Sequence, residues 1–292
     1  MAVAGRPNVG KSTLINTLIG QKIAAVSPRP QTTRRKQLGI LTLNIAQIIF
    51  LDTPGIHHPV HRLGEWMNQE ALDALYDADL VLWIVDISSE PTPADLICSK
   101  KIAALGKNPP VLLAMNKIDL ILSALIVTRS EMYHRLLPES HEYKISATTG
   151  QGIRELLNGV ILRLPEGPLY YPDEQVTDFY ERDIAVELIR EAALLLLRDE
   201  VPHCLAVRLD EYKDRDVKNS YIKATIFVEK DSHKGIVIGK GGSMLKKIGI
   251  YARNEIESMT GRRIYLELGV KVSENWRNDE HSLKLMGYDH RD

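Results

Sequence analysis

Cysteine is scarce in this 292-residue chain, which has only Cys98 and Cys204. The two lie far apart and lack the spacing of metal ligands, so the sequence offers neither a disulfide framework nor a zinc site. Long apolar runs are also missing, since no window approaches the ~18 apolar residues that a membrane-spanning helix needs. The first residues lack the charged and apolar regions of a signal peptide. These absences predict a cytoplasmic protein with reduced thiols.

An excess of charge of either sign is absent too, because 37 Lys and Arg residues against 38 Asp and Glu residues leave a net charge of -1. No global field attracts the molecule to polyanions, so any nucleic-acid surface must be local. A hydrophobic content of 44% and a charged content of 26% are ordinary for a globular protein. The length allows two domains, each with a core of its own.

The first half of the chain alternates short β-rich runs with longer helical patterns, which predicts a mostly parallel sheet with helices on both faces. Strands are expected at 1–4, 40–43, 48–51, 80–85, 111–115 and 142–145, and helices at 11–19, 66–76, 93–105, 130–137 and 153–163. The first strand is short, which leaves the true start of the chain open. The apolar segment 118–127 is either the start of a helix or a contact surface.

Three prolines and a glycine crowd residues 164–172 and predict an extended linker. A second unit follows, with a helix at 183–199, strands at 205–211 and 221–229, a helix at 243–260 and a last strand at 264–268. The predicted organisation is an α/β domain over 1–164, a linker over 165–182, a smaller α+β domain over 183–272 and a tail over 273–292.

Residues 5–12, Gly-Arg-Pro-Asn-Val-Gly-Lys-Ser, fit the pattern of a phosphate-binding loop. Gly5 and Gly10 let the backbone curl, so that its N–H groups point at a β-phosphate in front of a helix. Lys11 is expected to reach the β- and γ-phosphates and Ser12 to ligate Mg²⁺. The alternative is a glycine turn before an ordinary helix.

Asp52-Thr-Pro-Gly55 follows the apolar run 48–51. A carboxylate just past a buried strand can hold Mg²⁺ through water, and the N–H of Gly55 can meet the γ-phosphate because no side chain blocks the approach. Without the phosphate loop, this segment would be interpreted as a plain turn.

Asn116-Lys117-Ile-Asp119 determines the expected base. Asp119 can accept two hydrogen bonds from guanine, which adenine does not supply, and an unpaired buried carboxylate is costly. Asn116 is expected to tether the loop, Lys117 to stack over the base, and the backbone of Ser146-Ala147 to meet the guanine oxygen. The ligand is therefore predicted to be GTP or GDP.

The polar stretch 30–36 is typical of a segment that responds to the γ-phosphate. One threonine hydroxyl would complete the Mg²⁺ coordination only while that phosphate is present. We expect Thr33 in this role, with Thr32 as the alternative. A solvated basic loop is the simpler interpretation.

The position after Gly55 holds Ile56, where many small GTPases have a glutamine that orients water. Hydrolysis is therefore predicted to be slow or assisted. One hypothesis is that Asn8 coordinates K⁺, and its alternative is that Asn8 is a simple turn residue. Catalysis is expected to depend on positioning and charge neutralisation by Lys11, Thr33 and the backbone of Gly55, without a covalent intermediate.

The predicted nucleotide site draws on all of these segments. Its residues are Gly5, Arg6, Pro7, Asn8, Val9, Gly10, Lys11, Ser12, Thr13, Asp52, Thr53, Pro54, Gly55, Asn116, Lys117, Asp119, Ser146 and Ala147, with Mg²⁺ expected at Ser12, Thr33 and Asp52. His57, His58 and His61 are expected to lie on a mobile segment rather than to act as a base.

Gly239-Lys240-Gly241-Gly242 is a G-x-x-G loop in front of a helix, where glycines let the backbone lie against sugar-phosphate. Positive charge gathers around it, which is the local footprint of a nucleic-acid surface. Nearby apolar residues (Ile236, Ile238, Leu245 and Ile248) form either a groove for bases or simply core. Trp276 either stacks on a base or packs the tail onto the domain. The candidate RNA-binding residues are Lys234, Ile238, Gly239, Lys240, Gly241, Gly242, Lys246, Lys247, Arg253 and Trp276.

These motifs together make the chain resemble the Era family of bacterial GTPases over nearly its whole length. The resemblance rests on residues 5–12, 30–34, 52–55, 116–119, 146–147, 237–242, 248–253 and 266–272. It implies a Ras-like α/β P-loop GTPase domain joined to a type II KH domain. It also implies binding near the 3′ end of 16S rRNA, a role in assembly of the 30S subunit, a nucleotide-controlled rearrangement and, in some relatives, peripheral association with the inner membrane.

Other functions stay open at this stage. An RNA-modification GTPase would need a catalytic site in the C-terminal half, where Cys204 is a poor candidate nucleophile. A small-molecule kinase conflicts with Asn116–Asp119, and a non-hydrolysing RNA-binding protein would keep its nucleotide for structure. Nothing in the sequence demands more than a monomer.

Overall fold

The computed structural model describes residues 1–27, 29, 31–106 and 109–288. Pro30, the first residue of the polar stretch 30–36, and residues 289–292 of the predicted tail lie outside the described residues. The chain forms two compact units. The first contains 1–24, 33–59 and 64–178, and the second contains 25–32, 60–63 and 179–292. The change near residue 178 falls within the predicted linker, whereas the grouping of 25–32 and 60–63 with the second unit was not anticipated.

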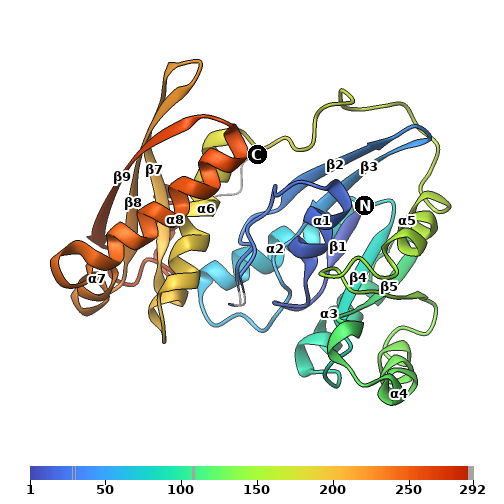
Figure 1. The fold of residues 1–292 in the computed structure, drawn as a ribbon. Coiled ribbons are helices and arrows are strands. Elements are labelled where there is room, and N and C mark those ends of the chain that lie inside the picture. Colours follow the sequence, from blue (N-terminus) through green and yellow to red (C-terminus); the bar gives the residue numbers. More distant parts are fainter. Residues whose placement is uncertain (28, 30, 107–108, 289–292) are drawn as a thin grey trace. The chain divides into compact units, whose positions relative to one another are not determined.

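The first unit is built on a six-stranded sheet in the order β2-β3-β1-β4-β5-β6 (Figure 1). Its strands are β1 (Ala2–Ala4), β2 (Gln37–Leu43), β3 (Ala46–Asp52), β4 (Val81–Asp86), β5 (Val111–Asn116) and β6 (His141–Lys144). Only the β2–β3 pair is antiparallel. β1 has three residues, yet it lies between β3 and β4 and is fully buried. The carboxyl ends of the parallel strands therefore meet at one edge, the usual ligand-binding edge of such sheets.

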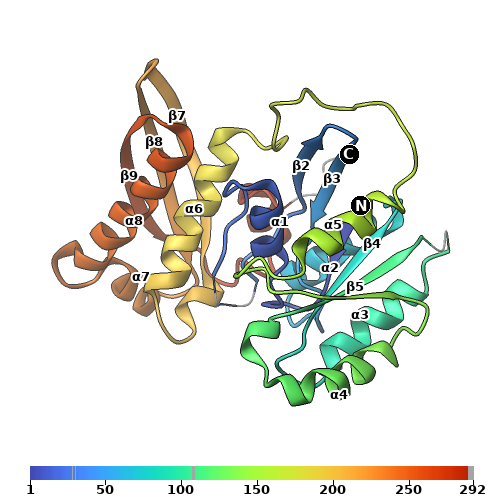
Figure 2. The same cartoon turned by 45° about the vertical axis from the view of Figure 1, so that its right-hand side comes forward.

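Helices cover both faces of this sheet because its central strands carry apolar residues on both sides. The helices are α1 (Lys11–Ile19), α2 (Arg62–Tyr76), α3 (Pro93–Ala103), α4 (Ser123–His134) and α5 (Ile153–Ile161). Leu82 and Ile84 of β4 pack with α1 and α5, whereas Val81, Trp83 and Val85 pack with α2, α3 and α4. Figure 2 shows α3 and α4 together on one side of the sheet. The core of the first unit thus has two layers, one on each face.

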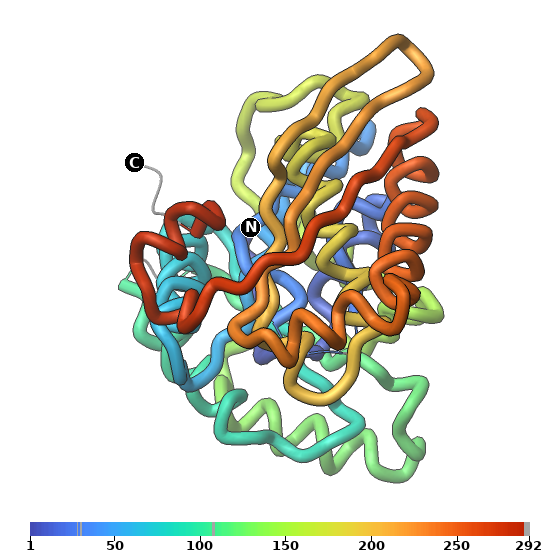
Figure 3. The backbone as a smooth tube through the Cα atoms, turned by 90° about the vertical axis from the view of Figure 1, so that its left-hand side faces the viewer, coloured from blue at the N-terminus to red at the C-terminus, as the bar shows by residue number. Residues whose placement is uncertain are grey.

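The second unit contains a three-stranded sheet, and its longer helices pack together on that sheet in one core. In chain order it contains α6 (Glu181–Leu196), β7 (Ala206–Asp216), β8 (Asn219–Val228), α7 (Asp231–Ile238), α8 (Ser243–Thr260), β9 (Arg263–Val272) and α9 (Glu280–Leu285). β8 pairs antiparallel with β7 and parallel with β9, and Figure 3 shows the three side by side. Alternate residues of β8, including Ile222, Ala224 and Ile226, join Leu188 of α6 and Ile248 of α8 in one core.

Most predicted elements are present, and two helices have the predicted bounds, 11–19 and 243–260. Three differences are corrections. The prediction of a helix at 130–137 is wrong about its start, since α4 begins at Ser123 and the apolar segment before it contains a short 3-10 helix, Ile118–Leu120. Helices α7 and α9 were missed. Within the described residues, no helix combines the length and apolarity needed to cross a bilayer.

Candidate nucleotide site and G-x-x-G surface

The loop between β1 and α1 adopts a conformation that only glycine tolerates at two positions. Gly5 has φ +153° and Gly10 has φ +102°. A Cβ atom added at Gly5 would lie 2.4 Å from the carbonyl oxygen of Ile84, and one added at Gly10 would lie 2.3 Å from Nδ2 of Asn116. Real Cβ atoms do not approach that closely, so the neighbouring strands dictate both glycines. The loop is therefore held against the ends of β4 and β5.

Lys11 is buried inside this loop, with only 6% of its surface exposed. Its Nζ donates to the carbonyl oxygens of Gly5 (3.3 Å) and Arg6 (3.1 Å). Burial lowers the pKa of the Lys11 ammonium from its ordinary value, although the Asp52 carboxylate opposes this shift. A cation that has lost most of its hydration and faces the start of a helix is suited to bind an anion.

Three side-chain oxygens meet where α1 begins. Ser12 Oγ lies 2.9 Å from Thr33 Oγ1 and donates to Asp52 Oδ2 at 2.7 Å, and Thr33 Oγ1 donates to the same oxygen at 3.3 Å. The other carboxylate oxygen, Oδ1, is buried and has no hydrogen-bond partner among the described residues. Burial raises the pKa of Asp52, while Lys11 and the two hydroxyls oppose the rise. Hard oxygen ligands with spare acceptor capacity are what Mg²⁺ prefers, so these residues fit that ion.

The structure separates the two threonines that were candidates for the metal. The hydroxyl of Thr33 lies in the oxygen cluster, whereas that of Thr32 donates to the carbonyl of Arg29 (2.7 Å) and lies 2.9 Å from Ser27 Oγ. The geometry thus favours Thr33.

Asn116 joins three loops of the site. Its Nδ2 donates to the carbonyl of Val9 at 2.8 Å, and its Oδ1 accepts from the N–H of Ala147 at 2.9 Å. Ser146 is fully buried, and its hydroxyl accepts from the N–H of Thr149 at 3.1 Å. The tether predicted for Asn116 is present, and it reaches both the phosphate loop and the Ser146-Ala147 loop.

The two charged residues of the same motif differ in environment. Lys117 has φ +70°, and its Nζ donates to the carbonyl of Asn8 (2.9 Å) and to Asp86 Oδ2 (2.6 Å). Asp119 follows in the 3-10 helix and is exposed. The carboxylate of Asp119 is therefore accessible to a base, and the discrimination expected from it stays a prediction.

The segment after β3 packs back onto the phosphate loop. A Cβ atom at Gly55 would lie 2.6 Å from the backbone N of Pro7, and the buried Thr53 donates its hydroxyl to the carbonyl of Val3 at 2.7 Å. Pro54 is buried as well. Ile56 is fully buried in the core, and its apolar side chain offers no group that could orient water. His57 is anchored, with Nδ1 2.7 Å from the carbonyl of Gly55.

Sequence reasoning missed the charged network beside this site. The side chain of Arg6 is directed at Asp95 (Nε to Oδ2, 3.1 Å) and Ser89 (Nη2 to Oγ, 3.2 Å), and Asp86 accepts from Lys117. The available signal was Asp86 itself, an acidic residue that ends an apolar strand as Asp52 does.

The G-x-x-G loop of the second unit is open. Gly239, Gly241 and Gly242 have φ of +71°, +59° and +79°, and a Cβ atom added at Gly241 or Gly242 would meet nothing within 4 Å. The cations around the loop are exposed (Lys240, Lys246, Lys247 and Arg253) or partly exposed (Lys234). The loop leads into the 18-residue helix α8, whose N-cap, Gly242, provides no side-chain hydrogen bond. Phosphate oxygens can therefore approach the first amides of α8.

The neighbouring apolar residues divide into two groups. Ile248 is fully buried in the core, whereas Ile236 is 48% exposed, and Ile238 and Leu245 are half-buried. Only the last three can face a base.

Trp276 requires a correction. The side chain is fully buried, stacks on Tyr288 with a centroid distance of 6.0 Å, and donates its indole N–H to the carbonyl of Cys204 at 2.8 Å. An RNA-binding role by stacking on a base is therefore wrong for Trp276. The alternative, packing of the tail onto the domain, is what the structure has.

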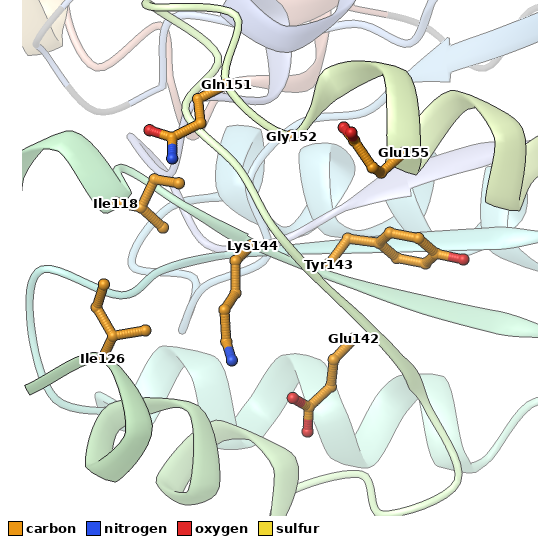
Figure 4. A pocket seen from close by; sticks show the side chains of 8 residues that line it. All are labelled: Ile118, Ile126, Glu142, Tyr143, Lys144, Gln151, Gly152 and Glu155. Carbon is orange, nitrogen blue, oxygen red and sulfur yellow. The ribbon is translucent and has the colours of Figure 1, made fainter. Parts of the chain in front are cut away.

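A separate cavity of about 520 Å³ lies beside β6 and the start of α5. Figure 4 shows Glu142 and Lys144 pointing the same way along β6, with Tyr143 between them pointing elsewhere. Ile118 of the guanine motif and Gly152, five positions after Ala147, also line the cavity. None of the residues that line the cavity belongs to the phosphate loop.

Family models match both units. A model described as "50S ribosome-binding GTPase" matches residues 1–117, and one described as "KH domain" matches residues 200–277. Two curated proteins named GTPase Era match almost end to end. The one from Carboxydothermus hydrogenoformans is 45% identical over 289 residues, covering 99% of this chain and 96% of that protein. The one from Lacticaseibacillus paracasei is 45% identical over 292 residues, covering 100% and 97%.

Two solved structures are similar to the whole chain. Era in complex with MgGDPNP and nucleotides 1506–1542 of 16S ribosomal RNA gives a TM-score of 0.93 at 40% identity, covering 98% of this chain and 97% of that one. A variant of Aquifex aeolicus Era bound to GDP·AlF4⁻ gives a TM-score of 0.91 at 39% identity, with the same coverage.

Proposed function

The chain belongs to the Era family of GTPases, and from this we propose that it is a GTP-hydrolysing switch that binds 16S rRNA near its 3′ end and acts in assembly and maturation of the 30S subunit. The observation that carries the proposal is the match over both units to a structure that holds a GTP analogue with Mg²⁺ and a 16S rRNA fragment. The GTPase family model has the large subunit in its description, but it covers only residues 1–117. The match that includes the KH domain is to a structure with a 16S rRNA fragment, which favours the small subunit as the binding partner.

The proposed division of labour follows the predicted domains. Residues 1–164 bind GTP, 165–182 form the linker, 183–272 form the KH domain and 273–292 form a tail. Support for the nucleotide site comes from the contacts that bring its segments to one edge of the sheet, namely Asn116 with Val9 and Ala147, and Ser12 with Thr33 and Asp52. Support for the RNA site comes from the open glycines and exposed lysines around 239–247.

In this proposal the chain acts by positioning. Lys11 and the N–H groups of residues 5–12 hold the phosphates, and the N–H of Gly55 meets the γ-phosphate. Ser12, Thr33 and Asp52 would hold Mg²⁺, which would supply positive charge to offset that of the phosphates. The buried Ile56 provides no group to orient water, so hydrolysis is slow.

Assistance from K⁺ at Asn8 belongs to the same proposal. Asn8 is an exposed residue of the phosphate loop with φ +65°. We expect faster hydrolysis in a potassium buffer than in a sodium buffer of the same ionic strength. Equal rates in the two buffers would contradict the idea. Peripheral membrane association is a weaker proposal, supported only by the resemblance to relatives.

RNA binding is tested with a labelled RNA from the 3′ end of the small-subunit rRNA, titrated in the presence of GDP and of a non-hydrolysable GTP analogue. Gly241→Asp places a carboxylate against the backbone phosphate of the RNA, so we expect at least a ~10-fold loss of affinity, since charge-assisted contacts to phosphate contribute strongly.

The matched control is Gly261→Asp at the other end of α8. Gly261 has φ +67° and the same open surroundings, so the strain and the added charge are equal. Equal losses in the two variants would move the RNA site away from residues 239–242. Absence of binding by the wild-type chain with either nucleotide would overturn the assignment of rRNA as the partner.

A further inference from the structure

Asp86 ends β4 at the same edge of the sheet as the nucleotide site. Its Oδ2 accepts from Lys117 Nζ at 2.6 Å, and its Oδ1 accepts from the N–H (3.1 Å) and hydroxyl (2.5 Å) of Ser88. The carboxylate is largely buried, with a side chain 10% exposed. Burial alone would raise the pKa of Asp86, but the hydrogen bonds from Lys117 and Ser88 outweigh it and lower the pKa below its ordinary value. The group is therefore held as a charged acceptor.

Lys117 spans from Asp86 to the phosphate loop. Its Nζ also donates to the carbonyl of Asn8 at 2.9 Å, and its backbone lies in the left-handed region. An ammonium on a four-carbon stem has many conformations in water. With hydrogen bonds to a carboxylate on one side and to a carbonyl on the other, the ammonium of Lys117 is held in place.

The same carboxylate faces the other end of the phosphate loop. Arg6 Nη2 lies 3.7 Å from Asp86 Oδ2, and Arg6 Nε donates to Asp95. Asp95 is itself fixed, because it is fully buried and forms a capping box with Thr92 at the start of α3. Its Oδ2 accepts from the N–H (2.9 Å) and hydroxyl (2.7 Å) of Thr92. Arg6 is thus anchored to a rigid helix end.

The backbone that carries Asp86 is also held in place. The buried hydroxyl of Tyr133 in α4 lies 2.9 Å from the carbonyl of Asp86 and 3.3 Å from that of Ser89. Burial raises the pKa of Tyr133 to about 12, so the hydroxyl stays protonated and able to donate. A rigid support and a charged network are the conditions under which one residue can fix the geometry of another.

From these contacts we propose that Asp86 is a positioning residue for guanine-nucleotide binding, which acts by holding Lys117 over the base site. This inference rests on the proposed function, since it requires that Lys117 contacts the base. It makes two claims. Loss of Asp86 weakens GTP and GDP together, because both have the same base. Hydrolysis at saturating GTP changes little, because the phosphate contacts of Lys11 and Ser12 do not involve Asp86.

The test is a double-mutant cycle on GDP affinity, measured with a fluorescent GDP on the full chain. The variants are Asp86→Asn, Lys117→Ala and the two combined. Asp86→Asn keeps the volume and an acceptor but removes the charge, so we expect a ~10-fold or greater loss of affinity, by analogy with residues that orient direct ligands. In the Lys117→Ala background the same substitution is expected to have an effect of less than about 2-fold, because positions that act through one another are not additive.

Equal losses in the two backgrounds would overturn the inference, since Asp86 would then act without Lys117. A drop in the single-turnover hydrolysis rate at saturating GTP as large as the drop in affinity would also overturn it. If Asp86→Asn lowers the melting temperature too far, Asp86→Glu takes its place in the cycle, with a smaller loss expected in the wild-type background and none in Lys117→Ala.

Glu90→Gln is the matched control. Glu90 lies in the loop that follows Asp86 and pairs with Arg129 at 2.8 Å. Its side chain is 66% exposed, and it makes no contact with Asp86 or Lys117 among the contacts described above. GDP affinity is expected to be unchanged, and a loss as large as that of Asp86→Asn would contradict a specific role for Asp86. If the wild-type chain bound no guanine nucleotide, the proposed function itself would be overturned. Equal losses of affinity in the two backgrounds would instead overturn only the role of Asp86, so the two failures can be told apart.

Discussion

At Gly10 of the phosphate loop an added Cβ atom would lie 2.3 Å from Asn116, whereas at Gly241 and Gly242 it would meet nothing within 4 Å. The lysines show the same contrast. Lys11 is buried and donates to carbonyl oxygens of its own loop, whereas Lys240 is exposed. Both loops are rich in glycine and precede a helix, but their surroundings differ.

The glycines of the two loops meet different requirements. In the phosphate loop, glycine is required by the protein's own packing, because β4 and β5 leave no room for a side chain. At Gly241 and Gly242 of the G-x-x-G loop, glycine is favoured by positive φ and leaves the surface open to a partner, whereas a Cβ atom at Gly239 would lie 2.8 Å from Met244. A side chain should therefore disrupt the packing of the first loop, whereas at Gly241 or Gly242 it should cost backbone strain and weaken the interaction with RNA.

The largest effect is expected from Gly10→Ala. The methyl group would displace Nδ2 of Asn116, which holds Val9, and alanine is strained at φ +102°. Displacing these groups by an ångström can cost ~100-fold in a positioned site, so we expect at least that loss in GDP affinity. Titration with a fluorescent GDP measures it.

Gly20→Ala separates strain from crowding. Gly20 caps α1 with φ +75°, and a Cβ atom there would meet nothing within 4 Å. We expect a loss of stability of about 1–2 kcal/mol, the cost of a left-handed residue, with GDP affinity unchanged. If Gly20→Ala weakened GDP as much as Gly10→Ala, the contrast between crowded and open glycines would fail.

The elements that the sequence predicted best are those with chemical markers at their ends. Helix α8 runs between Gly242 and Gly261, both left-handed, and its bounds were predicted as observed. Helix α7 was missed, because Gly235 and the run Ile236-Val-Ile238 have low helix propensity and favour a strand. Tertiary packing, with Val237 fully buried in the core, overrides that preference.

The residues of the nucleotide site also differ in how well the sequence predicts them. Each phosphate or base motif is a contiguous run of residues, so its members could be predicted. The partners of the Arg6 network are not, since Arg6 and Asp95 are 89 positions apart and only the fold brings them together. Trp276 was misjudged because an aromatic residue in a charged tail gives no local sign of burial.

Trp276→Ala tests the interior of the second unit, because it removes a buried side chain and leaves the open G-x-x-G loop unchanged. The substitution removes a fully buried ring and leaves the carbonyl of Cys204 without its indole donor. We expect a loss of unfolding free energy of about 3–5 kcal/mol, as for other large buried aromatics. Chemical denaturation measures it, and RNA affinity, measured well below the melting temperature, is expected to stay within about 2-fold of wild type.

Tyr265→Ala on β9 is the exposed counterpart. Tyr265 is 62% exposed and stacks on Tyr221 across the strands, so its removal should cost no more than about 1 kcal/mol. If Trp276→Ala instead weakened RNA binding strongly while costing as little stability as Tyr265→Ala, the tryptophan would have to leave its buried site to meet RNA. The open surface would then extend beyond the G-x-x-G loop into the tail, and the division between a crowded and an open loop would describe only one state of the second unit.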